Sequence, residues 1–244
     1  EGLSGSEENM VEEMNERKDE FGLSNSNFTN VTGWPNEDHY MSARDIVQIA
    51  KILIINFPEY YSLFSMKEFT YNDIKQYNRN KLIDDNYDGL KTGRTNQTGF
   101  GLIASAQRKD RRIISVVNGL NSDQERIKET KKLVEWAFRD FKKLNLYTEE
   151  QTIVETKVWL GNTSYVSLAA DKDIKVTIPK RDINKLQVKA KYKSPIPAPI
   201  KKGDKLGELV ISTGDNEISY PLVAGNDVKT INKFLRSFSI INYL

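Results

Sequence analysis

The sequence predicts an α+β protein that contains more than one domain. In the first part of the chain, apolar residues recur at helical spacing over 46–54 and 127–141, and strand-like runs lie between them at 88–94, 99–106 and 111–117. From residue 152 to 224, short β-rich runs alternate with turn signals, as is typical of a β-sandwich. We therefore expect an antiparallel sheet with helices, followed by a small all-β sandwich.

Composition excludes several classes of function. Lys and Arg number 36 and Asp and Glu number 34, so the net charge of +2 does not favour nucleic acid as a partner. The chain has no Cys, which excludes disulfides, thiolate metal sites and a Cys nucleophile. His, Asp and Glu nowhere cluster at the spacing of metal ligands, so we expect neither a metal nor another cofactor. No apolar run reaches the roughly 18 residues that a membrane-spanning helix needs.

The change in pattern suggests three segments. We place a mixed α/β domain at 1–148 and a β-sandwich at 149–226, with a linker near 145–151. The last segment, 227–244, has apolar residues on one broad helical face and Lys or Arg off it, as in helices that lie in a membrane interface. We expect a membrane-associating amphipathic helix there. Packing on the sandwich and disorder are the alternatives.

Three serines are placed to begin helices. Ser6, Ser42 and Ser122 each precede a segment of helical character, and their hydroxyls can accept a hydrogen bond from the first turn. Ser122 and Glu125 form a capping box. We expect the helix behind it to continue to the basic pair Lys142 and Lys143, which the helix dipole favours at a C-terminus. Residues 69–74 are expected to form an edge strand or a hairpin.

The tripeptide Lys91-Thr92-Gly93 is the main chemical signal, and it lies at the end of a strand-like run. Lys-Thr-Gly is one of three motifs that build the active sites of penicillin-binding proteins and serine β-lactamases. Lys91 would supply a fixed cation, and Thr92 would donate a hydrogen bond to a substrate carboxylate. Gly93 would allow close approach of a substrate backbone, and the N–H of Arg94 would point toward a developing oxyanion. Taken alone, the tripeptide fits an ordinary turn at the end of a strand about as well as it fits an active-site motif.

Other residues give weaker signals. Arg79, in the run Asn78-Arg79-Asn80, could bind a carboxylate, although a role in fixing the loop is about as plausible. The only histidine, His39, is interpreted as a polar loop residue rather than a catalytic base. Trp34, Trp136 and Trp159 are interpreted as packing residues.

Several runs together resemble the low-molecular-mass penicillin-binding proteins, the serine-type D-alanyl-D-alanine carboxypeptidases. The resemblance covers nearly the whole chain, and the β-rich module and terminal amphipathic segment follow in the order found in that family. Arg94 stands where many members carry His. The runs that carry the resemblance include Ser4-Gly5-Ser6-Glu7, Phe21-Gly22-Leu23, Thr32-Gly33, His39-Tyr40-Met41-Ser42-Ala43-Arg44-Asp45, Asn78-Arg79-Asn80, Asp88-Gly89-Leu90-Lys91-Thr92-Gly93 and Ala104-Ser105-Ala106.

The resemblance implies the C-terminal part of a β-lactamase/transpeptidase-like domain and an activity. The expected reaction removes the terminal D-Ala from peptidoglycan stem pentapeptides through an acyl-enzyme, with β-lactams as inhibitors. Lys91 and Arg94 would act in catalysis, and Lys91, Thr92, Gly93 and Arg79 in substrate binding. The expected location is the bacterial periplasm, peripheral on the outer face of the inner membrane through the C-terminal helix.

The family's nucleophile motif, Ser-x-x-Lys, does not occur in this sequence, and neither does its Ser-x-Asn element in a usable context. In the family both motifs lie N-terminal to the point that matches the start of this chain. We therefore expect residues 1–244 alone to be unstable or inactive. Two alternatives stay open, a non-catalytic peptidoglycan-binding or scaffolding protein and a relative of the serine β-lactamases. The β-rich module argues against the second.

Overall fold

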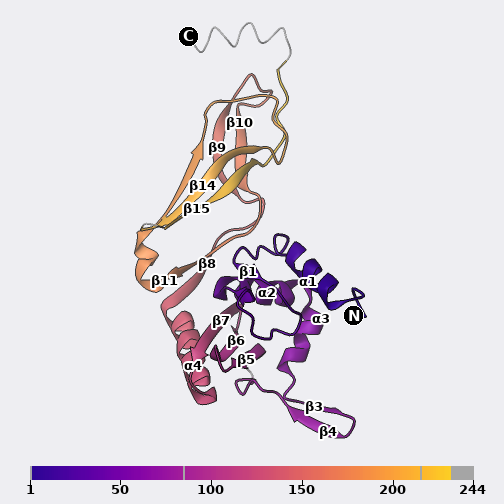
Figure 1. Ribbon diagram of the computed structural model, residues 1–244. Coiled ribbons are helices and arrows are strands. Elements are labelled where there is room, and N and C mark those ends of the chain that lie inside the picture. The colour runs from indigo at the N-terminus through magenta and orange to yellow at the C-terminus, as the bar shows by residue number, and fades with distance from the viewer. Residues whose placement is uncertain (1, 85, 215, 232–244) are drawn as a thin grey trace. The chain divides into compact units, whose positions relative to one another are not determined.

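The computed structural model describes residues 2–84, 86–214 and 216–231. The chain divides into two compact units, Glu1–Arg139 and Asp140–Leu244 (Figure 1). The division falls before the boundary at 148 that the sequence suggested, because residues 141–147 pair with a strand of the second unit.

The helices of unit 1 begin where the sequence places their caps. The Oγ atoms of Ser6, Ser42 and Ser122 each accept a hydrogen bond at 3.1 Å from a backbone N–H of the first turn. These three caps open α1 (Glu7–Glu16), α2 (Ala43–Asn56) and α4 (Asp123–Asp140). Between α2 and the sheet lie the short helix α3 (Pro58–Tyr61) and the 3-10 helix η1 (Ser62–Ser65).

A three-stranded antiparallel sheet forms the centre of unit 1. It consists of β5 (Tyr87–Thr95), β6 (Gly99–Arg108) and β7 (Arg111–Leu120), in that order (Figure 1). The three predicted strands are thereby confirmed. A hairpin of β3 (Glu68–Tyr71) and β4 (Ile74–Tyr77) precedes the sheet, and β1 (Ser26–Asn27) pairs with β2 (Tyr40–Met41).

Helices pack on both faces of this sheet. Leu102 and Ala104 of β6 are buried in one cluster with Val134 of α4. Ile103, the residue between them, packs instead with a cluster that includes Ala50 of α2. Alternate side chains of a strand point to opposite faces, so β6 lies between two helical layers.

Unit 2 is a β-sandwich with one large and one small sheet. The large sheet has six strands in the order β12-β14-β15-β10-β9-β13, and the small sheet pairs β11 with β8. Neighbouring strands run antiparallel except for β13 and β9, which run parallel. The strands are β8 (Phe141–Tyr147), β9 (Thr152–Trp159), β10 (Tyr165–Ala170), β11 (Ile174–Pro179), β12 (Leu186–Tyr192), β13 (Ile196–Pro197), β14 (Lys205–Thr213) and β15 (Asn216–Ala224), with the 3-10 helix η2 (Lys180–Lys185) before β12.

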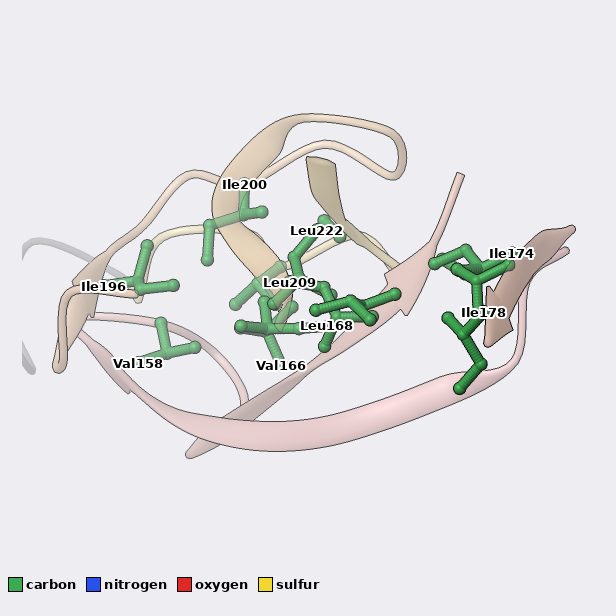
Figure 2. Packing of buried hydrophobic residues seen from close by; sticks show 14 residues of the cluster. Val158, Val166, Leu168, Ile174, Ile178, Ile196, Ile200, Leu209 and Leu222 are labelled. Carbon is green, nitrogen blue, oxygen red and sulfur yellow. The ribbon is translucent and has the colours of Figure 1, made fainter. Parts of the chain in front are cut away.

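A single apolar cluster of 14 buried residues fills the sandwich. Leu168, Leu209 and Leu222 of the large sheet lie near its middle (Figure 2). Ile174 and Ile178 of β11 lie at one end, and Val158, Ile196 and Ile200 at the other (Figure 2). Both sheets therefore contribute to one continuous core.

Strand β8 corrects the prediction for the end of α4. The helix was expected to reach Lys142 and Lys143, but it ends at Asp140, and both lysines lie on β8. Leu144 and Leu146, two residues apart, pack against the core of the sandwich. The alternation of these two leucines fits a strand, and burying them in the sandwich overrides the helical pattern of the preceding residues.

The prediction of a helix over 227–244 is wrong for its first residues. Val228 is buried and exchanges backbone hydrogen bonds of 2.8 and 2.9 Å with Ile200, and Thr230 bridges Gly161. Residues 227–231 are therefore held against the sandwich outside any helix. The rest of the predicted helix lies outside the described residues. No helix in the described part of the chain is long and apolar enough to cross a membrane.

The three tryptophans, which the sequence suggested as packing residues, are partly or largely exposed. Trp34 is 75% exposed, Trp136 44% and Trp159 41%. For Trp159 the reason is strand alternation, because its neighbour Val158 takes the inward position.

Candidate functional site

Strand β5 carries the predicted tripeptide at the edge of the sheet of unit 1. Lys91, Thr92 and Gly93 pair with Ile103, Leu102 and Gly101 of β6. No other described strand pairs with β5, so its second edge is unpaired within the described residues. Lys91 and Gly93 are exposed, and Thr92 is half-buried. A ligand can therefore reach the side chains of the tripeptide and the open edge of the strand.

The loop that carries Arg79 is fixed by two asparagines. The Nδ2 of buried Asn80 donates to the carbonyl of Gly89 on β5 at 2.9 Å, and its Oδ1 accepts from the N–H of Leu82 at 3.1 Å. The Nδ2 of Asn78 donates to the carbonyl of Met66 at 2.8 Å. These bonds hold the loop beside β5 and leave the side chain of Arg79 exposed.

All the predicted site residues line one cavity. Its volume is about 460 Å³. Arg79, Lys91, Thr92, Gly93 and Arg94 therefore share one pocket. Four residues that the sequence analysis did not propose complete the lining, namely Lys81, Phe100, Asp123 and Arg126.

Arg126 is the most informative of the four. It lies in the first turn of α4 and is only 7% exposed. A guanidinium nitrogen lies 3.3 Å from the carbonyl oxygens of both Gly93 and Gly101. The centre of the guanidinium also lies 5.5 Å from the ring centroid of Phe100, and that of Arg94 lies 4.7 Å from the same ring. A buried cation is thus fixed directly beside the tripeptide.

The sequence contains one signal that Arg126 is buried. Arg126, Thr130 and Val134 recur every four residues, so they share one face of α4. All three are buried, and the hydroxyl of Thr130 donates to the carbonyl of Arg126 at 2.6 Å. A charged residue on the helical face that carries the core residue Val134 indicates a buried contact. The pattern does not say which group the residue contacts.

The cavity carries an excess of positive charge. Five cationic side chains and one carboxylate, that of Asp123, line it. Lys81 donates to Asp123 at 2.7 Å, and Arg126 forms a second ion pair with the same carboxylate. The hydrogen bond from Lys81 holds the pKa of Asp123 below its usual value, so this group stays charged at neutral pH. Among the described lining residues, Lys91, Arg79 and Arg94 have no carboxylate partner, so the pocket suits an anionic ligand.

A polar network behind β5 fixes the start of the strand. Asp88 pairs with Arg112 at 2.6 Å and accepts a hydrogen bond from the hydroxyl of Tyr61 at 2.7 Å. Burial raises the pKa of Tyr61 to about 12. A Cβ on Gly89 would lie 2.7 Å from that hydroxyl, so only glycine fits at this position without displacing Tyr61. The network sets the position of β5 shortly before Lys91.

His39 does not belong to the cavity. Its Nδ1 accepts a hydrogen bond from the N–H of Thr29 at 3.1 Å, and its ring meets that of Phe28 edge-on at 5.9 Å. These contacts fit its interpretation as a loop residue. No group of His, Asp and Glu side chains in the described ranges could hold a metal ion.

Two family models match the chain, one for each unit. Residues 1–122 match the D-alanyl-D-alanine carboxypeptidase family, and residues 141–230 match the C-terminal domain of penicillin-binding protein 5. Both matches agree with the resemblance that the motifs indicated.

Individual relatives cover almost all of the chain but only part of their own length. The D-alanyl-D-alanine carboxypeptidase DacA of Haemophilus influenzae is 40% identical over 93% of the chain and 60% of its own length. DacC of Escherichia coli is 35% identical over 98% of the chain and 61% of its own length. The chain thus spans about three fifths of the curated relatives that it matches.

Solved structures support the same architecture. The crystal structure of penicillin-binding protein 5 from Haemophilus influenzae matches with a TM-score of 0.84 and 38% identity, over 93% of the chain and 68% of that structure. DacD from Francisella tularensis matches with a TM-score of 0.70 and 27% identity, over 94% and 70%.

Proposed function

We propose that this chain, which belongs to the D-alanyl-D-alanine carboxypeptidase family, supplies the carboxylate-binding wall of a serine-type carboxypeptidase. The reaction would remove the terminal D-Ala from peptidoglycan stem peptides through an acyl-enzyme, on a serine that is not among residues 1–244. One observation carries the proposal. The Lys91-Thr92-Gly93 edge strand lies in a cavity where five cations face a single, already paired carboxylate.

The geometry suggests a role for each residue. The side chains of Lys91 and Thr92, together with the buried guanidinium of Arg126, would bind the terminal carboxylate of the peptide through charge-assisted hydrogen bonds. The peptide backbone would lie along the open edge of β5 at Gly93, which has no side chain to block it. The N–H of Arg94 would stabilise the oxyanion, and exposed Arg79 would attract the anionic substrate.

We further propose that β-lactams acylate the same serine. The supporting observation is a likeness in fold to penicillin-binding protein D2 of Listeria monocytogenes, whose structures contain ampicillin and cefotaxime. That likeness has a TM-score of 0.50 at 29% identity over 53% of the chain. A β-lactam carries a carboxylate next to its scissile amide, so Lys91 and Arg126 would bind it as they bind the peptide.

The proposed location is the periplasm, on the outer face of the inner membrane. The support is the amphipathic pattern of the C-terminal segment, where apolar residues fall on one broad helical face and Lys233 and Arg236 lie off it. Such a segment would hold the enzyme close to its peptidoglycan substrate.

Intact-mass measurement tests the acyl-enzyme. The polypeptide that carries this chain is purified from its own cells and weighed before and after incubation with penicillin. We expect a mass above that of residues 1–244 and a gain of one penicillin. Lys91→Ala should slow the labelling by roughly a hundredfold, because a charge-assisted contact to the β-lactam carboxylate is lost.

Lys128→Ala is the matched control, since Lys128 lies on the exposed face of α4 and outside the cavity. It should label at the unaltered rate. A protein that gains no mass would contradict the acyl-enzyme. The non-catalytic peptidoglycan-binding function, favoured by the lack of a Ser-x-x-Lys sequence in these 244 residues, would then replace it.

A further inference from the structure

The turn between β9 and β10 presents two aromatic side chains to solvent. Trp159 is 41% exposed and Tyr165 is 53% exposed. With Lys157, Thr163, Ser164 and Ile231 they line a cavity of about 380 Å³. We call these six residues the Trp159 patch. The patch lies in unit 2 and shares no residue with the cavity beside Lys91.

The backbone under the patch is fixed. Val158 and Val166 point into the core, which leaves Trp159 and Tyr165 on the outer positions of their strands. The carbonyl of Trp159 accepts a hydrogen bond from the N–H of Ala198 at 2.9 Å. At Gly161, a Cβ would lie 2.6 Å from Cγ1 of Val158 and 2.7 Å from Cγ1 of Val228. The turn is therefore tightly packed at Gly161, and the core positions beside Trp159 and Tyr165 are already filled by valines.

The described chain ends inside this patch. The N–H of Asn162 donates to the carbonyl of Lys229 at 2.7 Å, and the N–H of Ile231 donates to the carbonyl of Leu160 at 3.0 Å. The segment that follows, 232–244, is rich in Phe, Ile and Leu and contains Lys233 and Arg236. The patch thus includes Ile231, the residue that directly precedes segment 232–244 in the sequence.

The chemistry of the patch fits a lipid headgroup layer. Trp and Tyr combine an apolar ring with a polar atom and are enriched at membrane–water interfaces. Lys157 adds a cation on a long apolar stem, and Ser164 adds a hydroxyl that would need a hydrogen-bond partner in a dry protein contact. Residues 140–244 contain 17 Lys and Arg against 12 Asp and Glu, a balance that favours an anionic surface.

We propose that the Trp159 patch is a second membrane contact, which inserts Trp159 and Tyr165 into the headgroup region of an anionic bilayer. This inference rests on the proposed membrane association of the C-terminal segment and adds to it a fixed contact from the folded domain. Two linked contacts raise the affinity for the membrane more than either alone, because the second binds at a high effective concentration.

Tryptophan fluorescence locates the contact. Among residues 1–244, Trp34→Phe and Trp136→Phe leave Trp159 as the only tryptophan, and Trp34→Phe with Trp159→Phe leaves Trp136 as the matched reporter. Any tryptophan of the full protein outside these residues is changed to Phe in both variants. Each protein is mixed with phosphatidylcholine vesicles that contain phosphatidylglycerol, with and without brominated lipid. We expect a blue shift and bromine quenching for Trp159 and neither for Trp136.

Binding measurements separate the two contacts. Trp159→Ala with Tyr165→Ala should weaken binding to the phosphatidylglycerol vesicles about tenfold, because two half-exposed rings lose their burial in the interface. Tyr192→Ala, on the edge strand β12 of the same unit and 36% exposed, is the control and should leave binding unchanged.

Three results would overturn the inference. If the chain binds vesicles but Trp159 is not quenched, only the C-terminal segment contacts lipid and the proposed membrane association survives. If the emission of Trp159 is already blue-shifted without vesicles and lipid does not change it, residues 232–244 cover the patch. If no variant and no parent protein binds vesicles, the membrane association itself fails.

Discussion

The two units of the chain are stabilised in different ways. Unit 2 is built around one cluster of 14 buried apolar residues, to which both of its sheets contribute. In the described part of unit 1, the apolar core is split into clusters of six and three residues on opposite faces of the sheet. Among the described residues, unit 1 also holds most of the buried polar side chains, and Thr156 is the one found in unit 2. Those of unit 1 are Ser26, Asp45, Asn80, Ser105, Ser115, Arg126 and Thr130.

The difference follows from what each unit has to hold. An apolar core stabilises a sandwich without directing any single side chain. The candidate site needs Lys91, Arg126 and Arg79 at fixed positions, and fixed positions require directional hydrogen bonds such as those of Asn80 and Asp88. We therefore expect unit 2 to respond most to lost apolar volume and unit 1 to lost polar contacts.

The largest effect is expected in the core of unit 2. Leu168 is fully buried near the middle of the cluster, so Leu168→Ala should lower the free energy of unfolding of unit 2 by about 3 kcal/mol through lost burial and a residual cavity. Hydrogen exchange of β10 and β15 would measure it. Ile218→Ala, at a half-exposed position of β15, is the control, and equal losses for both variants would show that the cluster does not dominate stability.

A smaller loss is expected from the polar network of unit 1. Arg112→Ala should destabilise unit 1 by about 2 kcal/mol, because Asp88 loses its ion pair and stays partly buried. Exchange of the β5 amides would report the change. Lys75→Ala, which removes the exposed ion pair with Glu68, should leave the stability of unit 1 nearly unchanged. An equal loss of stability in Lys75→Ala and Arg112→Ala would contradict the expected difference between the exposed and the partly buried ion pair.

The smallest effect is a pH dependence that arises from Tyr61. Its pKa of about 12 in the folded protein lies above the value of 10.0 for a free tyrosine. The neutral hydroxyl therefore contributes stability in full below pH 10, and this contribution is lost as the pH rises through about 12. At pH 11 the loss should be about 1 kcal/mol.

Tyr61→Phe removes the titrating group, so its stability should not show this decline. Urea unfolding of both proteins at mildly and strongly alkaline pH makes the comparison, and Tyr71→Phe, at a largely exposed position, serves as the control. Identical pH profiles for the parent and Tyr61→Phe would contradict the assignment.

Sequence patterns predicted the elements whose local signal agrees with their packing. The strands around Lys91, the serine caps and most strands of the sandwich follow from alternation and turn residues. Strand β8 was missed because its apolar residues continue a helical pattern, and only pairing with β11 selects a strand. The start of the C-terminal segment was misassigned for a similar reason, since Val228 is held by a bridge to Ile200, which is distant in sequence.

The candidate site was predicted only in part. Lys91, Thr92, Gly93, Arg94 and Arg79 were identified from motifs, and the structure places them in one cavity. Arg126 was missed because it is 33 residues from Gly93 in sequence and joins it only when α4 packs on the sheet. An arginine on a helix is usually solvated, so only the tertiary contact distinguishes this one.

The central claim is that the cavity binds a terminal carboxylate, and a pair of substrates tests it most directly. The purified enzyme is given a peptide that ends in D-Ala-D-Ala, either with its free carboxylate or as the carboxamide. We expect kcat/KM to fall roughly a hundredfold for the carboxamide, because buried Arg126 and exposed Lys91 lose their anionic partner. Arg126→Ala should reduce that preference to about tenfold or less. Equal turnover of the two peptides, or an unchanged preference in Arg126→Ala, would contradict the account.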